Sequence, residues 1–166
     1  MNEAVSLILK HRRSGALLDA NLLLIYAVGK YDKNFLSVCH HTKQYTADFP
    51  LIEYLIEFFS ILYTTPNVLT EVSNLGGKLG PTFFVTLGAM VSVLREEYCA
   101  SKDAASNAAF GKLGLTDAGI INVAAKKCLV LTADWALYQT LRSNDIDAVN
   151  INHLRQLEWL GQPQHG

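Results

Sequence analysis

The chain has 166 residues, half of them apolar and 17% charged, and its formal net charge is -1 at pH 7. This composition is typical of one compact domain with a buried core and lies far from the composition of disordered proteins. The near-zero charge gives no strong electrostatic footprint for nucleic-acid binding, although it leaves room for a local basic rim.

The cysteines and the apolar runs indicate where the protein resides. The three cysteines, Cys39, Cys99 and Cys128, are far apart, so we predict neither a disulfide framework nor a zinc knuckle. Basic residues near the N-terminus follow an apolar stretch, which is the reverse of a signal peptide. Every apolar run is interrupted before the roughly 18 to 20 residues that a membrane-spanning helix needs. We therefore expect a cytoplasmic protein without a membrane segment.

The first half of the chain alternates between short apolar runs and amphipathic segments, which predicts alternating strands and helices. Gly29 ends the first of these helices, and Pro50 marks the first turn of the second. The predicted elements are a strand at residues 16–19, a helix at 21–28, an irregular connection or insertion at 30–48, a helix from about 48 to 62 and a strand at 63–65.

The second half continues this alternation. Thr65 is expected to cap a helix that begins at Pro66 and carries Glu71 beside its apolar face. The next predicted elements are a long apolar helix from Pro81 to about Cys99 and a flexible joint at 101–114. After the joint we predict a helix at 118–127 capped by Thr116, a strand at 128–131, a helix at 134–144, a strand at 148–151 and a helical turn at 153–160. We predict an α/β fold, one domain over residues 1–166 with a mostly parallel sheet between helices on both faces.

Four acidic residues, Asp19, Glu71, Asp117 and Asp134, stand where this alternation would bring them together. They follow apolar strands or lie in the adjoining helices, near the strand ends where open α/β sheets place their chemistry. Several carboxylates brought within a few ångströms repel one another and either protonate or recruit a cation. Because all the ligands are oxygen atoms, we predict a hard divalent ion, magnesium or manganese. Such an ion can activate water for the hydrolysis of a phosphodiester.

Each acid also has a purely structural interpretation. Asp117 and Asp134 closely follow threonines and could simply place a negative charge near a positive helix end. Glu71 could lie on a solvated helix face. Asp19 is harder to explain in this way, because it ends the predicted central strand, where a buried charge needs a partner. The metal site is therefore predicted from the joint placement of the four acids.

The sequence around these acids resembles that of PIN-domain ribonucleases. Leu-Leu-Asp-Ala-Asn surrounds Asp19, Leu-Thr-Asp-Ala surrounds Asp117, and Leu-Thr-Ala-Asp ends at Asp134. The order acid, helix, strand, acid over residues 113–134 is the most specific part of a resemblance that covers nearly the whole chain. It implies a PIN fold in which the four acids hold magnesium or manganese and an activated water cuts single-stranded or structured RNA.

The resemblance also suggests supporting residues and partners. Asn21 and Thr132 would orient a metal-bound water or a carboxylate, and their structural alternatives are a helix cap and a strand end. Many PIN-domain proteins are toxins paired with an antitoxin, so an antitoxin is an expected partner. The chain departs from the compact members of that group at residues 30–48 and in the apolar helix after Gly80. The alternative function is a non-catalytic PIN-like module that binds RNA or protein.

RNA binding near an acidic site needs positive charge. The candidate residues, for which solvated surface is the alternative, are Lys10, Arg12 and Arg13 before the first strand, and Lys112, Lys126 and Lys127. Cys39, His40 and His41 offer soft ligands, but neighbours in sequence point in different directions, so we assign them no metal role. Trp135 and Tyr138 are interpreted as core residues rather than as platforms for base stacking.

The helix predicted from Pro81 leaves little polar face, because most of its residues are apolar. A helix that is apolar nearly all round must be covered on several sides. One sheet covers only one of these sides, so we predict that the rest of the helix packs on other helices, including the one predicted at residues 51–62, or on a second copy of the chain. The expected assembly is a homodimer, and an antitoxin peptide is the alternative cover.

Overall fold

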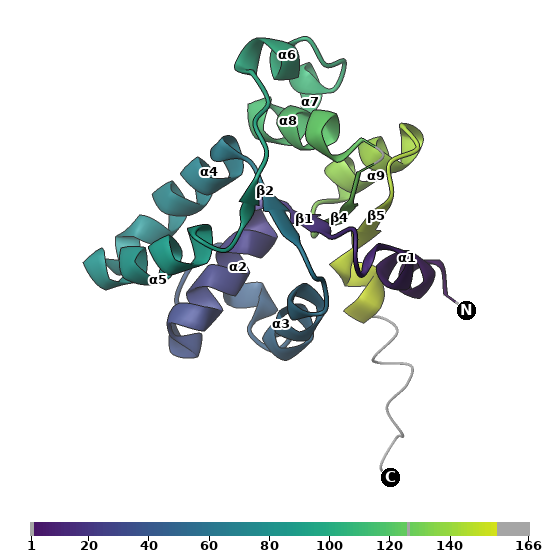
Figure 1. Cartoon of the computed structure of the whole chain (residues 1–166). Helices are drawn as coiled ribbons and strands as arrows, with labels where there is room; N and C mark the ends of the chain where they lie inside the picture. The colour runs from purple at the N-terminus through teal and green to yellow at the C-terminus, as the bar shows by residue number, and fades with distance from the viewer. Residues whose placement is uncertain (1, 126, 156–166) are drawn as a thin grey trace.

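The computed structural model of the protein describes residues 2–125 and 127–155 (Figure 1). Its strands form one parallel sheet in the order β3-β2-β1-β4-β5. They are β1 (Ala16–Leu18), β2 (Leu62–Thr64), β3 (Arg95–Glu96), β4 (Leu129–Thr132) and β5 (Ala148–Asn150). Strand β1 lies in the middle, with Ala16 opposite Leu62 on one side and Leu129 on the other. The predicted α/β fold is confirmed.

Helices cover both faces of the sheet, as predicted (Figure 1). The longer ones are α1 (Glu3–His11), α2 (Ala20–Tyr31), α3 (Phe49–Glu57), α4 (Pro66–Gly76), α5 (Pro81–Val91), α8 (Leu115–Ala124) and α9 (Trp135–Ser143). The short elements are the helices α6 (Ser101–Ala105) and α7 (Phe110–Leu113) and the 3-10 turns η1 (Lys33–Leu36), η2 (Lys43–Tyr45) and η3 (Gly77–Leu79). Because crossovers between parallel strands are right-handed, α2 to α5 lie on one face and α8 and α9 on the other.

The core lies around the three strands β1, β4 and β5, in which every residue is buried. A strand covered on both faces has no solvated side, which explains why these segments are continuous apolar runs rather than alternating ones. Helix α2 is also apolar on most sides, because it contacts α3, α4 and α5 as well as the sheet. This packing fixes the ends of β1 and β4 in space.

Several predicted boundaries are wrong. Helix α5 ends at Val91 rather than near Cys99, because the chain then pairs with β2 as the edge strand β3. Residues 101–114 are not a flexible joint, since they contain α6 and α7. Gly114 has a φ of 85°, a conformation that favours glycine, and the next helix begins directly after it. Thr116 therefore lies inside α8 and does not cap it.

Residues 30–48, named the insertion from here on, are more regular than predicted. Helix α2 continues to Tyr31, and the turns η1 and η2 follow. Leu36, Thr42 and Tyr45 are buried, and the Thr42 hydroxyl donates a hydrogen bond to the Leu36 carbonyl oxygen at 2.9 Å. The insertion is therefore packed onto the domain.

None of the described helices is long and apolar enough to cross a membrane. At the C-terminal end, residues 151–155 are helical, in agreement with the predicted helical turn. The rest of that turn, residues 156–160, lies outside the described residues, and so does Lys126.

Candidate metal centre

The candidate site lies where the order of the strands changes direction. From β1 the chain proceeds to β2 and β3 on one side, and then returns to β4 and β5 on the other. Ligands of open α/β sheets bind at such a switch point, outside the carboxyl ends of the strands. Asp19 directly follows β1, and Asp134 lies two residues after the last residue of β4, Thr132. The topology therefore brings together two acids that are distant in sequence.

A cleft of about 150 Å³ opens at this edge of the sheet. Its lining includes Asp19, Asn21, Glu71, Asp117 and Asp134, so the structure brings all four predicted acids to one place. We call it the acid cleft. Pockets that hold small organic ligands usually have volumes of about 300 to 1,000 Å³. The acid cleft is smaller, and it suits an ion with its water molecules better than a whole nucleotide.

Asp19 is the most firmly held of the four acids. Its Oδ1 accepts a hydrogen bond from the Leu22 backbone N–H at 2.8 Å and so caps α2, a role that Asn21 therefore does not have. Its Oδ2 accepts hydrogen bonds from the Thr132 hydroxyl and from the Ala133 backbone N–H. Burial raises the pKa of Asp19 although these donors oppose the shift. In the described part of the chain, Asp19 forms no ion pair with a basic side chain.

Thr132 connects the ends of the two strands. Its hydroxyl donates a hydrogen bond to Asp19 and accepts one from the Asp134 backbone N–H at 2.9 Å. The residue is completely buried. Asp134 itself is exposed, and its Oδ1 accepts a hydrogen bond from the Leu137 N–H at 2.8 Å, so it caps α9. Thr132 thus holds one acid directly and the loop of the other.

Glu71 and Asp117 come from α4 and α8 and complete the cleft. The Thr116 hydroxyl donates to Glu71 Oε1 at 2.6 Å and ties the two helices together. Asp117 is partly buried in the first turn of α8, and it accepts no hydrogen bond from any described residue. Burial raises the pKa of Asp117 to about 7, and the charges of the other three acids raise it as well. A nearby cation would therefore stabilise the ionised form of Asp117.

The donor set fits a hard divalent ion in its chemistry, because every side chain offers oxygen. The side chains do not form a ready coordination shell: within residues 2–125 and 127–155, no three His, Cys, Asp or Glu side chains converge closely enough to hold a metal ion. Asp19, Glu71 and Asp134 instead direct an oxygen to the nearest hydrogen-bond donor. Magnesium commonly takes only one or two carboxylates and keeps several waters, so the residues present are compatible with it.

The basic residues before the first strand do not lie at the acid cleft. Lys10 forms an ion pair with Asp147 at 2.7 Å, and the Arg12 guanidinium lies 4.9 Å from the centre of the Phe58 ring. Arg13 is exposed beside them. All three precede β1, so they lie at the amino edge of the sheet, whereas the acids lie at its carboxyl edge.

The second group of predicted basic residues is divided. Lys127 forms an ion pair with Glu97, and its amino group lies 5.2 Å from the centre of the Tyr63 ring. Lys112 is exposed on α7 and precedes Leu113, which lines the acid cleft. Lys112 itself does not line the acid cleft, and lines a pocket with Trp135 and Tyr138 instead.

The interpretation of Trp135 as a core residue is wrong. The residue is 55% exposed, and its ring lies 5.5 Å from that of Tyr138, which is partly buried against the core. Helix α9 buries the face that carries Leu137 and Leu141. Trp135 precedes Leu137 by two residues and therefore points to the opposite side of the helix.

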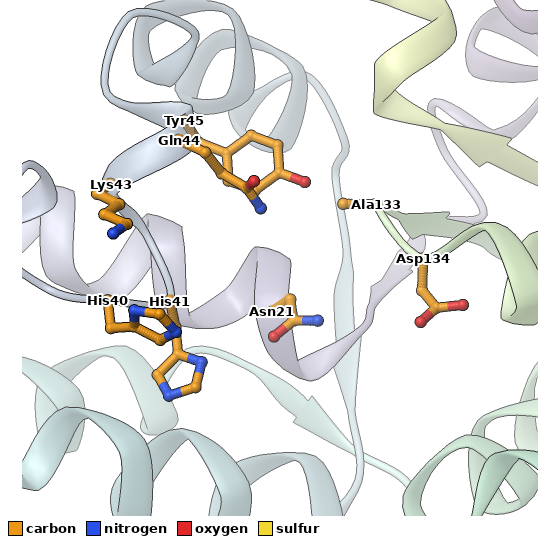
Figure 2. Close-up of a pocket in the computed structure, with 8 residues that line it drawn as sticks. All are labelled: Asn21, His40, His41, Lys43, Gln44, Tyr45, Ala133 and Asp134. Carbon is orange, nitrogen blue, oxygen red and sulfur yellow. The ribbon is translucent and has the colours of Figure 1, made fainter.

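The insertion supplies residues that the sequence analysis did not assign to a site. A second pocket, lined by His40, His41, Lys43, Gln44 and Tyr45 together with Ala133, shares Asn21 and Asp134 with the acid cleft (Figure 2). The concentration of basic and hydrogen-bonding residues at 40–45 was visible in the sequence. Their position beside Asp134 depends on tertiary packing, so it could not be predicted from the sequence.

No model of a known protein family matches the chain, and no curated protein matches it in sequence. The likeness to PIN-domain ribonucleases is therefore carried by the motifs around the acids and by their order along the chain. The class that the structure itself defines is a parallel α/β domain with an acidic cleft at its switch point.

Proposed function

We propose that this chain is a PIN-like endoribonuclease that depends on magnesium or manganese and hydrolyses phosphodiester bonds of single-stranded RNA. The observation that carries the proposal is that four carboxylates line one small cleft at the switch point of the sheet. The raised pKa of Asp117 supports it: burial first, and then the charges of the other three acids, raise it to about 7, and a bound cation would favour the ionised form.

Asp19, Asp117 and Asp134 are the residues that would hold the ion, with Glu71 beside them. When bound, the ion would neutralise charge on the phosphate and make a coordinated water more acidic. The protein fixes the geometry: the Thr132 hydroxyl and two backbone N–H groups hold the Asp19 carboxylate in one orientation.

The direct test is cleavage of mixed RNA with magnesium or manganese by wild type and by Asp19→Asn and Asp117→Asn. Asparagine keeps the size of aspartate and can still cap α2, but its amide nitrogen cannot accept the hydrogen bond from the Ala133 N–H, so the melting temperature of Asp19→Asn is measured beside its cleavage. Asp103→Asn is the matched control, because Asp103 is exposed on α6 and does not line the acid cleft. We expect both cleft variants to lose cleavage and the control to keep it. Equal cleavage by all four proteins would refute the proposal.

A non-catalytic PIN-like module that binds RNA or protein is the second candidate. Two observations favour it: Asp19 and Asp134 serve as helix caps, and no described group of three ligands is ready to hold an ion. Calorimetry with manganese separates the candidates, since a module without a metal site should give no heat of binding. Metal binding that disappears in Asp117→Asn would favour the enzyme.

Because many PIN-domain proteins are toxins, we also propose that the chain is a toxin with an antitoxin partner. The exposed apolar residues around α5 support a protein partner. Phe84 and Val85 on α5 are 45% and 73% exposed, and Val93 after it is 78% exposed. Monomeric proteins seldom expose contiguous apolar surface without a use for it. We propose that a second copy of the chain covers these residues, because two-fold homodimers are the commonest assemblies.

A further inference from the structure

The pocket beside the acid cleft has one wall made by the insertion (Figure 2). We call it the insertion pocket. It has a volume of about 360 Å³, and it adjoins the acid cleft at Asn21 and Asp134, which line both. Figure 2 shows His40, His41 and Lys43 on one side, Asp134 on the other and Asn21 between them.

The insertion wall is held in place by buried contacts. Thr42, between the two pocket residues His41 and Lys43, is fully buried and bonded to the Leu36 carbonyl oxygen. Tyr45 is only 6% exposed, and the Arg155 guanidinium lies 5.6 Å from the centre of its ring. The side chains that line the pocket therefore project from a fixed backbone.

Arg155 also joins this wall to the opposite one. Its Nη2 lies 2.9 Å from Asp48 Oδ2 in the insertion, and its Nη1 donates a hydrogen bond to Asn152 Oδ1 at 3.1 Å. The Asn152 side-chain amide donates in turn to the Ala133 carbonyl oxygen at 3.2 Å. Ala133 precedes Asp134, so the two walls are connected by a continuous series of polar contacts, and the pocket keeps its shape.

The chemistry of the insertion wall suits an anionic ligand. Lys43 is positively charged, and the His40, His41 and Gln44 side chains, all exposed, offer further N–H donors. Burial raises the pKa of Tyr45, so its hydroxyl stays protonated and can donate. The wall has few apolar side chains, as expected for a surface that meets a phosphate backbone rather than the core of a protein interface.

The volume of the insertion pocket and its position beside the acid cleft indicate which anionic ligand fits it. The volume lies at the lower end of the range of about 300 to 1,000 Å³ for ligand pockets, which suits one nucleotide unit. A nucleotide there would lie directly beside the acid cleft, which is too small for a nucleotide and suits an ion. Asp134 is the one carboxylate in the lining of this pocket, whereas four carboxylates line the acid cleft, so the insertion pocket offers a hard metal ion fewer anionic oxygen ligands.

We propose that the insertion pocket binds a nucleotide of a single-stranded RNA next to the phosphate in the acid cleft, with His40, His41 and Lys43 contacting its backbone phosphate. The inference rests on the proposed function, because it assumes that RNA enters the acid cleft. In this proposal the insertion, where the chain departs from compact PIN domains, holds the RNA strand beside the point of cleavage.

The test is RNA binding by the whole protein in EDTA, measured by fluorescence anisotropy with a short labelled single-stranded RNA over a range of salt concentrations. The main variant replaces His40, His41 and Lys43 by alanine. Lys43→Arg retains the charge, and Lys33→Ala removes a charge from the same insertion outside the pocket. The triple variant should bind at least about tenfold more weakly, and its salt slope should fall by about 0.7 for each lost phosphate contact. Lys43→Arg and Lys33→Ala should bind like wild type.

Unchanged affinity and slope in a triple variant that melts like wild type would overturn the inference, and so would a wild type that binds no RNA. Equal competition by poly-glutamate would also overturn it, because it would identify a site for an acidic protein. Cleavage assays with manganese on the same proteins separate this inference from the proposed function. A wild type that binds through the pocket but never cleaves refutes only the nuclease. A triple variant that binds and cleaves like wild type refutes only the role of the pocket.

Discussion

Replacing Asp117 by asparagine should stabilise the metal-free protein, and the gain should grow as the pH rises. In the folded protein, burial and the three neighbouring acids raise the pKa of Asp117 from 3.8 to about 7. Below pH 3.8 the carboxyl group is protonated in both the folded and the unfolded chain, so it carries no penalty. Between these two values only the unfolded chain ionises, so wild type loses stability as the pH rises. Above pH 7 the penalty is complete and constant.

The size of the effect follows from that change. A pKa that moves from 3.8 to about 7 corresponds at most to roughly 4 kcal/mol of unfolding free energy. Asp117 is partly exposed, and solvent screens part of the repulsion from its neighbours. We therefore expect the asparagine variant to gain on the order of 1–2 kcal/mol at pH 8 and almost nothing near pH 3.5.

The assay is urea unfolding in EDTA at a series of pH values, with wild type, Asp117→Asn and the control Asp103→Asn. The free energy of unfolding of Asp117→Asn should separate from that of wild type between about pH 4 and pH 7, whereas the control should run parallel to wild type. If the curve of Asp117→Asn also runs parallel to wild type, neither burial nor the neighbouring acids disfavour the ionised form of Asp117, and the prediction is refuted.

Three further predictions concern the ion, the support of the site and the assembly. Manganese at a hundredfold excess over Kd should stabilise wild type by about 2.7 kcal/mol and so raise its melting temperature, with a smaller rise in Asp117→Asn. A melting temperature that manganese leaves unchanged in calorimetry would contradict the site. Thr132→Val should cost about 1–3 kcal/mol in urea unfolding, because Asp19 and the Asp134 N–H lose a partner, whereas Thr132→Ser should stay near wild type. Light scattering should show a homodimer that Val85→Glu converts to a monomer; a monomeric wild type would refute the homodimer.

Much of the fold was predictable because its determinants are local. The segments that became β1 and β4 are continuous apolar runs, which is what burial on both faces demands. The cap of α4 was also predicted from the sequence. Thr65 accepts a hydrogen bond from the Val68 N–H at 3.2 Å. A capping side chain and its N–H partner are near in sequence, so the pattern alone indicates them.

The remaining features depend on contacts between distant segments. Strand β3 consists of the exposed residues Arg95 and Glu96, which have no apolar pattern, and only pairing with β2 makes them a strand. The insertion comes to lie beside Asp134 through the contacts of Arg155. Neither relation has a local signature in the sequence. The joint placement of the acids could be anticipated, in contrast, because the alternation of strands and helices already determines which strand ends meet.

The structural interpretation of the acids and the metal interpretation do not exclude each other at Asp19 and Asp134. A carboxylate oxygen that caps a helix still has a free lone pair, and the cap holds the side chain in place for a further partner. Capping cannot explain Asp117, which accepts no hydrogen bond from the described residues and lies among three other acids. Helix-end charge alone would lower its pKa, whereas burial and repulsion raise it to about 7. Of the three aspartates, Asp117 is therefore the one whose environment a helix-end role does not account for, and the metal proposal depends on it most.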